Sequence, residues 1–144
     1  MSDLLHTVIA DELSALRTCL ADALPNCRVF EEYEYRRAAA LSVASLTLGV
    51  KAVRLSEGYL AKVAGYASGA LTLADTVEVD YAVTVHCPVA DGGDAGRLLQ
   101  TKAADALRWG TGIAFARLVT GAPTYDRISR CLRFPLTVTV RYLL

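Results

Sequence analysis

The feature that most constrains this chain is a long alternation of apolar and polar residues at positions 71–86. The apolar positions of one parity are Leu71, Leu73, Val77, Val79, Tyr81, Val83 and Val85, and the other parity holds Thr72, Thr76, Glu78, Asp80, Thr84 and His86. Successive strand residues point to opposite faces, so the pattern predicts one strand with an apolar and a polar face. At ~3.3 Å per residue it would be about 50 Å long, and we expect part of it to project as one arm of a long hairpin.

An amphipathic helix is expected on each side of this strand. At positions 3–24 apolar residues recur at helical spacing, with Ser2 able to cap the beginning and Pro25 to end the helix. The second helix follows the Asp-Gly-Gly-Asp turn at 91–94 and ends at Gly110. Its predicted apolar face consists of Leu98, Leu99, Ala103, Ala106 and Leu107.

Shorter alternating runs predict the remaining strands. They lie at residues 28–35, 41–55, 113–119 and 132–142, with a polar turn at 121–126 before the last of them. The parity of the second run shifts near Gly49, which predicts a bulge or break. Residues 58–69 contain glycines at both ends and no clear period, so we expect a mobile loop there.

These elements predict a single α+β domain spanning residues 1–144. Apolar residues make up 53% of the chain and charged residues 21%, which is typical of a packed globule. The connections are short and favour antiparallel pairing. We therefore expect an antiparallel or mixed sheet of about four to five strands, with the N-terminal helix and the second helix packed on it.

The charge balance and the apolar runs exclude several classes of function. Fifteen basic residues match fifteen acidic ones, so no global field attracts a nucleic acid, and we expect no sequence-specific nucleic-acid partner. Acidic residues interrupt the N-terminal segment, and no run of about 18 uncharged apolar residues occurs. We expect neither a secretion signal nor a membrane partner.

Residues that could carry chemistry are scattered. Four cysteines form no Cys-x-x-Cys pair, and we expect them to be small, mostly buried hydrophobic residues. His86 and Cys87 are adjacent, so on a strand they diverge, and we expect a solvent-side histidine and a core cysteine. Glu31, Glu32 and Glu34 are interpreted as a solvated, charge-paired strand face. We predict no catalytic residue, no metal site and no cofactor, and hence no enzyme.

Aromatic and basic residues instead form candidate subunit or partner interfaces. One group lies in the first strand region and the other around the last turn and strand: Tyr33, Tyr35, Arg36 and Arg37, then Tyr125, Arg127, Arg130 and Arg133. Such residue types are common at interface hot spots. Trp109, at the end of the second helix, is expected to fill the core instead.

The order of these elements resembles that of tail terminator and tail completion proteins of long-tailed bacteriophages. The likeness includes the N-terminal helix, the strand through Tyr33-Glu34-Tyr35, the strand at 76–85, the helix at 95–109 and the closing turn and strand at 125–142. It implies a homo-oligomeric ring, commonly a hexamer, that caps the tail tube and joins it to the head connector. It also implies assembly in the host cytoplasm, a final place in the virion tail, and no enzyme activity.

Two other functions remain open at this point. A neck or minor tail structural protein could share the same plan of elements. A small ligand-binding or enzymatic α+β domain would have its pocket between helix and sheet and would recruit His86, Cys87 or Glu78.

Overall fold

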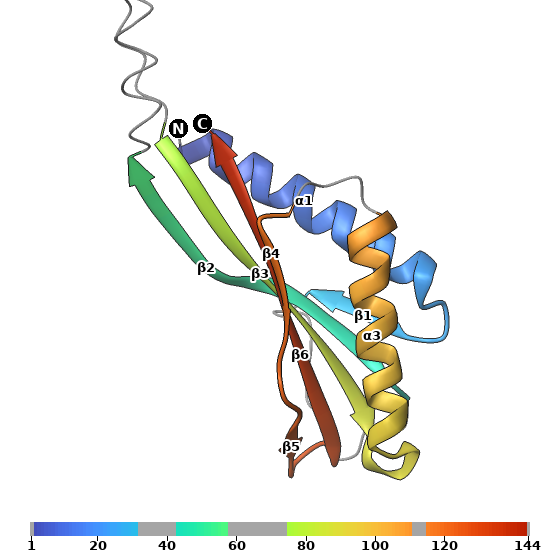
Figure 1. The fold of residues 1–144 in the computed structure, drawn as a ribbon. Helices are drawn as coiled ribbons and strands as arrows, with labels where there is room; N and C mark the ends of the chain where they lie inside the picture. Colours follow the sequence, from blue (N-terminus) through green and yellow to red (C-terminus); the bar gives the residue numbers. More distant parts are fainter. Residues whose placement is uncertain (1, 32–42, 58–74, 111–114, 144) are drawn as a thin grey trace, which may run out of the picture.

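The computed structural model describes residues 2–31, 43–57, 75–110 and 115–143 (Figure 1). The elements are α1 (Ser2–Ala23), β1 (Arg28–Glu31), β2 (Ser45–Glu57), β3 (Asp75–Pro88), the 3-10 turn η1 (Val89–Asp91), α3 (Gly93–Gly110), β4 (Arg117–Thr120), β5 (Thr124–Asp126) and β6 (Cys131–Leu143). The strands form one mixed six-stranded sheet, and both helices pack on it. The predicted α+β class is confirmed.

Strand β3 is the centre of the sheet. It pairs antiparallel with β2 from Asp75 to His86, and with β6 from Thr76 to Pro88. Strand β3 forms a long hairpin with β2, as expected, but β6 flanks the described part of β3 on its other side, so that part does not project from the sheet. The strand is long because it has a neighbour of similar length on each side, and the alternation along one strand carries no information about those neighbours.

The expected break in the second strand is a bulge. Register between β2 and β3 shifts between Val50 and Ala52, so Lys51 is an extra residue on β2. The shift keeps Val53 and Leu55 on the same face of the sheet as Leu48. The change of parity in the sequence therefore matches the bulge, and the apolar side chains of β2 stay on one face of the sheet.

Two features of the sheet differ from expectation. β1 pairs parallel with β2, with Arg28 beside Ser45, so the sheet is mixed, although the short connections favoured antiparallel pairing. A parallel neighbour needs a crossover of about a dozen residues or more, and positions 32–44 supply that length. The predicted polar turn at 121–126 contains a short strand, β5. The predicted mobile loop at 58–69, and the first positions of the run that begins at Leu71, lie outside the described residues.

The core lies between the helices and one face of the sheet. The β3 side chains of one parity, from Val77 to Cys87, are fully buried, as predicted from the alternation. Leu16 and Leu20 of α1 and Leu107 of α3 cover them. Burying each such large side chain contributes roughly 1.5–3 kcal/mol, so this row accounts for much of the stability.

The apolar face of α3 differs from the predicted one. Its buried residues are Gly96, Gln100, Ala103 and Leu107, whereas Leu98 is 55% exposed. Gln100 is tolerated in this stripe because its Nε2 donates to the carbonyl oxygens of Gly121 (3.2 Å) and Pro135 (2.8 Å).

Trp109 does not fill the core as expected, because its side chain is 75% exposed. It lies two positions beyond Leu107, about 200° around the helix from the buried stripe. The guanidinium of Arg108 lies 4.7 Å from the ring centroid. A tryptophan side chain favours burial, but this one lies on the side of the helix away from the core and is therefore exposed.

Close packing at Gly96 gives a testable consequence. A methyl group there would overlap the ring of Phe134, which is buried in the core. We expect Gly96→Ala to lower the free energy of unfolding by about 1–3 kcal/mol through overpacking, although alanine favours helices. Denaturant unfolding measures this. Gly93→Ala is the matched control, because a methyl group at Gly93 would meet no atom within 4 Å; equal effects of the two substitutions would contradict the prediction.

Candidate interaction surface

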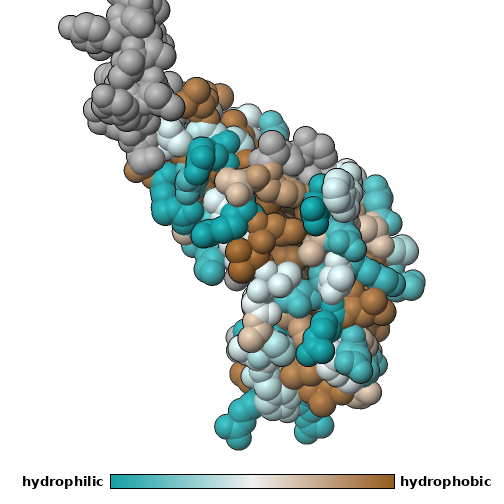
Figure 2. Space-filling view, in the orientation of Figure 1, coloured by the Kyte–Doolittle hydropathy of each residue, from teal (hydrophilic) through white to brown (hydrophobic). Residues whose placement is uncertain are grey.

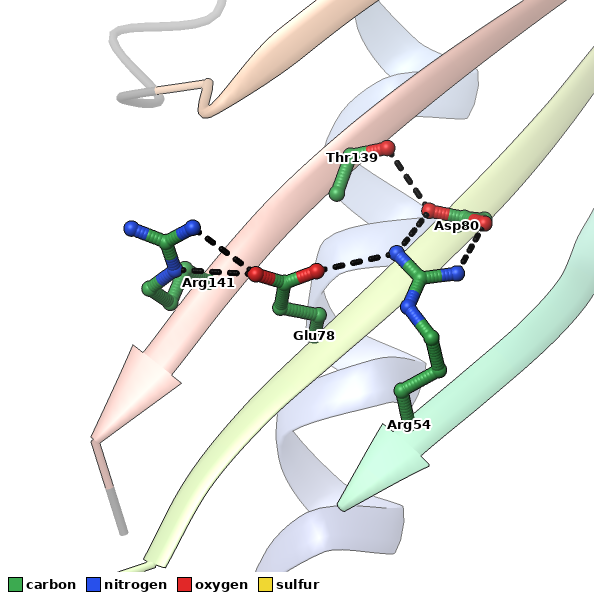
Figure 3. Close-up of polar contacts among 5 residues, drawn as sticks. All are labelled: Arg54, Glu78, Asp80, Thr139 and Arg141. Atoms are coloured by element: carbon green, nitrogen blue, oxygen red, sulfur yellow. Dashed lines mark hydrogen bonds and ion pairs between the residues drawn. The ribbon is translucent and has the colours of Figure 1, made fainter. Parts of the chain in front are cut away.

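The sheet face opposite the helices, here called the open face, carries a ladder of alternating charges across the three long strands (Figure 3). Register places Arg54 of β2 opposite Glu78 of β3, and Glu78 opposite Arg141 of β6. One step along the strands, Asp80 lies opposite Thr139. The polar half of the β3 alternation therefore meets complementary residues on both neighbours.

Short hydrogen bonds connect the members of this ladder. Arg54 binds Asp80 through both terminal nitrogens, with Nη1–Oδ2 at 2.6 Å and Nη2–Oδ1 at 3.0 Å, and Nη2 also donates to Glu78 at 3.0 Å. Arg141 donates to the other oxygen of Glu78 from Nη2 (2.8 Å) and Nε (3.1 Å). Thr139 Oγ1 donates to Asp80 at 2.6 Å. The ladder fixes the register of the three strands.

The arginines also keep the two carboxylates ionised. The hydrogen bonds from Arg54 lower the pKa of Asp80 to about 2, against the opposing effect of burial. Hydrogen bonds from Arg141 and then Arg54 lower the pKa of Glu78. A general acid needs a pKa near the working pH, so these carboxylates are unsuited to that role. They hold the three strands together, while the side chains of Arg54 and Arg141 stay 46% and 61% exposed.

A second cluster fixes the turn between β5 and β6, whose residues 125–130 we call the tip. Asp126 Oδ1 accepts a hydrogen bond from the amide of Ile128 at 3.1 Å. Its Oδ2 accepts from Ser129 Oγ at 2.9 Å and from Arg133 Nη2 at 2.8 Å. Asp126 and Ser129 are buried, so the tip has an internal polar support.

The tip carries several of the side chains that were predicted from the sequence to form an interface. Tyr125 is 57% exposed, and Arg127 and Arg130 are exposed as well. Arg133 has a different role, because its ion pair with the buried Asp126 supports the tip. Ile128, also 57% exposed, belongs to this surface but was missed, because no pattern marks a single apolar residue in a turn.

The other nominated residues, Tyr33, Tyr35, Arg36 and Arg37, lie outside the described part of the chain. So do Glu32 and Glu34 of the acidic group. Its first member, Glu31, lies on the helix side, 4.0 Å from Arg17 of α1.

His86 and Cys87 point to opposite faces, as predicted. Cys87 is in the core, but His86 is also buried and its Nε2 lies 3.0 Å from Thr47 Oγ1, so the predicted solvent-side histidine is wrong. A side chain on the open face of a central strand is flanked by those of both neighbouring strands, which bury it. Burial, followed by the nearby Asp91, raises the pKa of the Cys87 thiol. All four cysteines are free, two of them buried and two partly buried.

Two observations bear on ligand sites in the described residues. Within the described ranges no three His, Cys, Asp or Glu side chains are grouped as metal ligands would be. A hollow of about 450 Å³ lies between α1 and the end of α3, and its lining residues are Asp11, Ser14, Ala15, Thr18, Cys19, Asp22 and Gly110. It therefore lies on the surface of the helix layer and not between helix and sheet.

In the described part of the chain, two stretches of outer strand have no strand beside them. β1 covers β2 only at residues 45–48, and among the described residues no strand pairs with the outer side of β2 beyond that point. Val50, Val53 and Leu55 on this stretch are 37%, 42% and 62% exposed. At the opposite edge, β4 pairs only with β6 within the described ranges, and Val119 is 47% exposed. On the face seen in Figure 2, apolar patches are separated by hydrophilic side chains.

No protein-family model matches the chain, and no match was found among curated proteins. Separately, none of the helices in the described residues is long and apolar enough to cross a membrane.

The charge ladder gives a pH-dependence that can be tested. Because folding lowers the pKa of Asp80, its ionised form stabilises the fold above pH ~4, and this contribution is lost as the pH falls toward 2. We expect Asp80→Asn to cost about 1–3 kcal/mol at pH 7 and to weaken the acid dependence between pH 4 and 2. Denaturant unfolding across pH 2–7 measures both effects.

The control for this prediction is Asp105→Asn, which changes an exposed carboxylate on α3. It should change stability little at any pH, because exposed charges contribute little. If Asp80→Asn kept the full acid dependence of the unaltered protein, the proposed role of Asp80 would be refuted.

Proposed function

We propose that this chain is a structural subunit of virion assembly, a tail terminator-like protein that caps a phage tail tube and joins it to the head connector. The observation that carries the proposal is that, among the described residues, β2 beyond residue 48 and β4 have no strand on their outer sides and bear exposed apolar side chains. Open edges are templates for another chain, and proteins usually cover or block them. A subunit that functions in an assembly covers them with neighbours.

The order of elements supports the same proposal. In the described residues, helix α1, the strands β1 and β2, the central strand β3, helix α3 and the closing strands follow one another as in the family that the sequence resembles. On this proposal the subunits form a ring, a hexamer in the assembled tail. They assemble in the host cytoplasm and remain in the virion tail.

The tip is suited to a contact with a different partner. Tyr125, Arg127 and Arg130 are of the types enriched at hot spots, and Ile128 adds apolar surface beside them. The buried Asp126 fixes the turn before any partner binds, which reduces the entropy lost on binding. We assign the tip to the contact with the tail tube or the head connector.

A neck or minor tail protein is the nearest alternative, since the same edges and tip would serve there. The ligand-binding or enzymatic alternative has less support. Its residues His86 and Cys87 lie on opposite faces, burial raises the pKa of the Cys87 thiol, and the pKa of Glu78 is lowered. A thiolate nucleophile needs the opposite shift.

Tail-tube assembly in vitro tests the proposed function. Tubes are polymerised from the tube protein encoded in the same genome, with and without this protein, and their lengths are measured by negative-stain electron microscopy. We expect the protein to bind tube ends as rings and to stop growth. Tubes that grow unchanged and carry no bound protein would contradict a terminator function, and binding along the neck only would favour the neck alternative.

Charge reversal at the tip tests the assignment of that surface. We expect Arg127→Glu with Arg130→Glu to weaken binding to tubes or connector by at least about tenfold while self-association remains intact. Arg97→Glu, an exposed arginine on α3, is the matched control and should bind normally. Binding is measured by co-sedimentation, and unchanged binding by the tip variant would show that this surface is not used.

A further inference from the structure

We infer that β2 of one copy pairs antiparallel with β4 of the next, so that the sheet continues from subunit to subunit. The partner of each open edge is thus a second copy of this chain. The inference rests on the self-assembly proposed above and names the surfaces that carry it.

The β2 edge is preformed for such pairing. Its inner side is held against β3 along the whole strand, and on the open face Arg54 is bound to Glu78 and Asp80. Among the described residues its outer side at 49–57 has no strand beside it. Val53 and Leu55, on the helix side of this stretch, are 42% and 62% exposed and are positioned to contact an added strand. Little order has to be gained on binding.

The β4 edge is held in the same way. Four residues of β4 pair with β6, and two further backbone bonds extend the pairing: Ala116 N to Thr139 O and Gly121 N to Pro135 O, both 2.9 Å. Residues 116–121 are therefore fixed on their inner side. Val119, on the open face, is 47% exposed, and Leu118 lies on the helix side. Residues 116–121 are fewer than the residues of the open stretch 49–57 of β2, so the whole of 116–121 can pair with β2.

Strand direction gives the geometry of the contact. β2 and β6 run in one direction and β3 and β4 in the other, because each neighbouring pair in this row is antiparallel. A rotation that keeps the helices of every copy on the same side of the sheet also keeps these directions. It brings β2 of one copy beside β4 of the next as an antiparallel pair, the commoner pairing in sheets.

A head-to-tail contact of this kind covers both edges with one interface. A twofold contact between two β2 strands would cover β2 and leave β4 open in every copy. Head-to-tail contacts also close into rings when the rotation between copies allows it. The two open edges therefore favour the head-to-tail arrangement over the twofold dimer.

Two blocked variants test the contact. The first carries Val53→Lys and Leu55→Lys on β2, and the second Val119→Lys and Thr120→Lys on β4; all four side chains are exposed, so the fold should tolerate them. Lysine on an edge strand opposes the addition of another strand. We expect each variant alone to be monomeric at a concentration where the unaltered protein assembles. An equimolar mixture should give a 1:1 heterodimer and nothing larger, because only one pair of intact edges remains.

Analytical ultracentrifugation distinguishes the outcomes, with circular dichroism to confirm folding and Leu98→Lys, an exposed residue on α3, as the matched control. If the β4 variant assembled normally and only the β2 variant did not, the twofold dimer would hold and the inference would fail. Normal assembly of both variants would also overturn it, while self-assembly itself would stand. If the unaltered protein stayed monomeric even with tail tubes present, the proposed function would fail first.

A second readout does not depend on lysine. Ala52→Cys on β2 and Val119→Cys on β4 place thiols on the same face of the sheet. In a background with Cys19→Ser and Cys27→Ser, which removes the two partly buried native thiols, a bismaleimide should link the two single variants when they are mixed, and should link neither to itself. Links within the Ala52→Cys sample alone would contradict the head-to-tail contact.

Discussion

The pairing of β3 with β2 and β6 along its whole length is the interaction on which the rest of this structure depends. Because of this pairing, the side chains on both faces of β3 have a structural role. One row, from Val77 to Cys87, forms the core beneath the helices, and the other row contributes Glu78 and Asp80 to the charge ladder on the open face. Because β2 and β6 flank the described part of the central strand along its whole length, a partner strand can add only to the strands outside it.

The helix layer is fixed to the same framework by a partly buried chain of hydrogen bonds. Tyr142 of β6 donates to Glu12 of α1 at 2.8 Å, and the hydroxyls of Tyr142 and Tyr81 lie 2.8 Å apart. Burial raises the pKa of Tyr81 to about 12 and also raises that of Tyr142, so both hydroxyls keep their protons. These hydrogen bonds hold α1 against β3 and β6 at the end of the sheet where β2 has its open edge. The strands next to that edge are therefore held in place.

The sequence was most informative where one residue pattern decides the outcome. The alternation along β3 predicted its buried row, and the parity shift near Gly49 predicted the bulge, since both follow from side chains alternating along a strand. It was least informative about what lies beside a strand. The parallel pairing of β1, the central place of β3 and the burial of His86 all depend on neighbours far along the chain. Exposed tip residues such as Arg127 could be predicted as interface residues from their residue type. The open edges could be recognised only once the order of the strands in the sheet was known.

The central claim is that the outer sides of β2 and β4 are where neighbouring copies add. Hydrogen exchange measured by mass spectrometry, at a dilution that gives monomer and at a concentration that gives assembly, tests it most directly. The account predicts slower exchange on assembly at residues 49–55 and 116–121, with little change along β3, whose amides are already paired on both sides. Assembly that left exchange at both edges unchanged would contradict it.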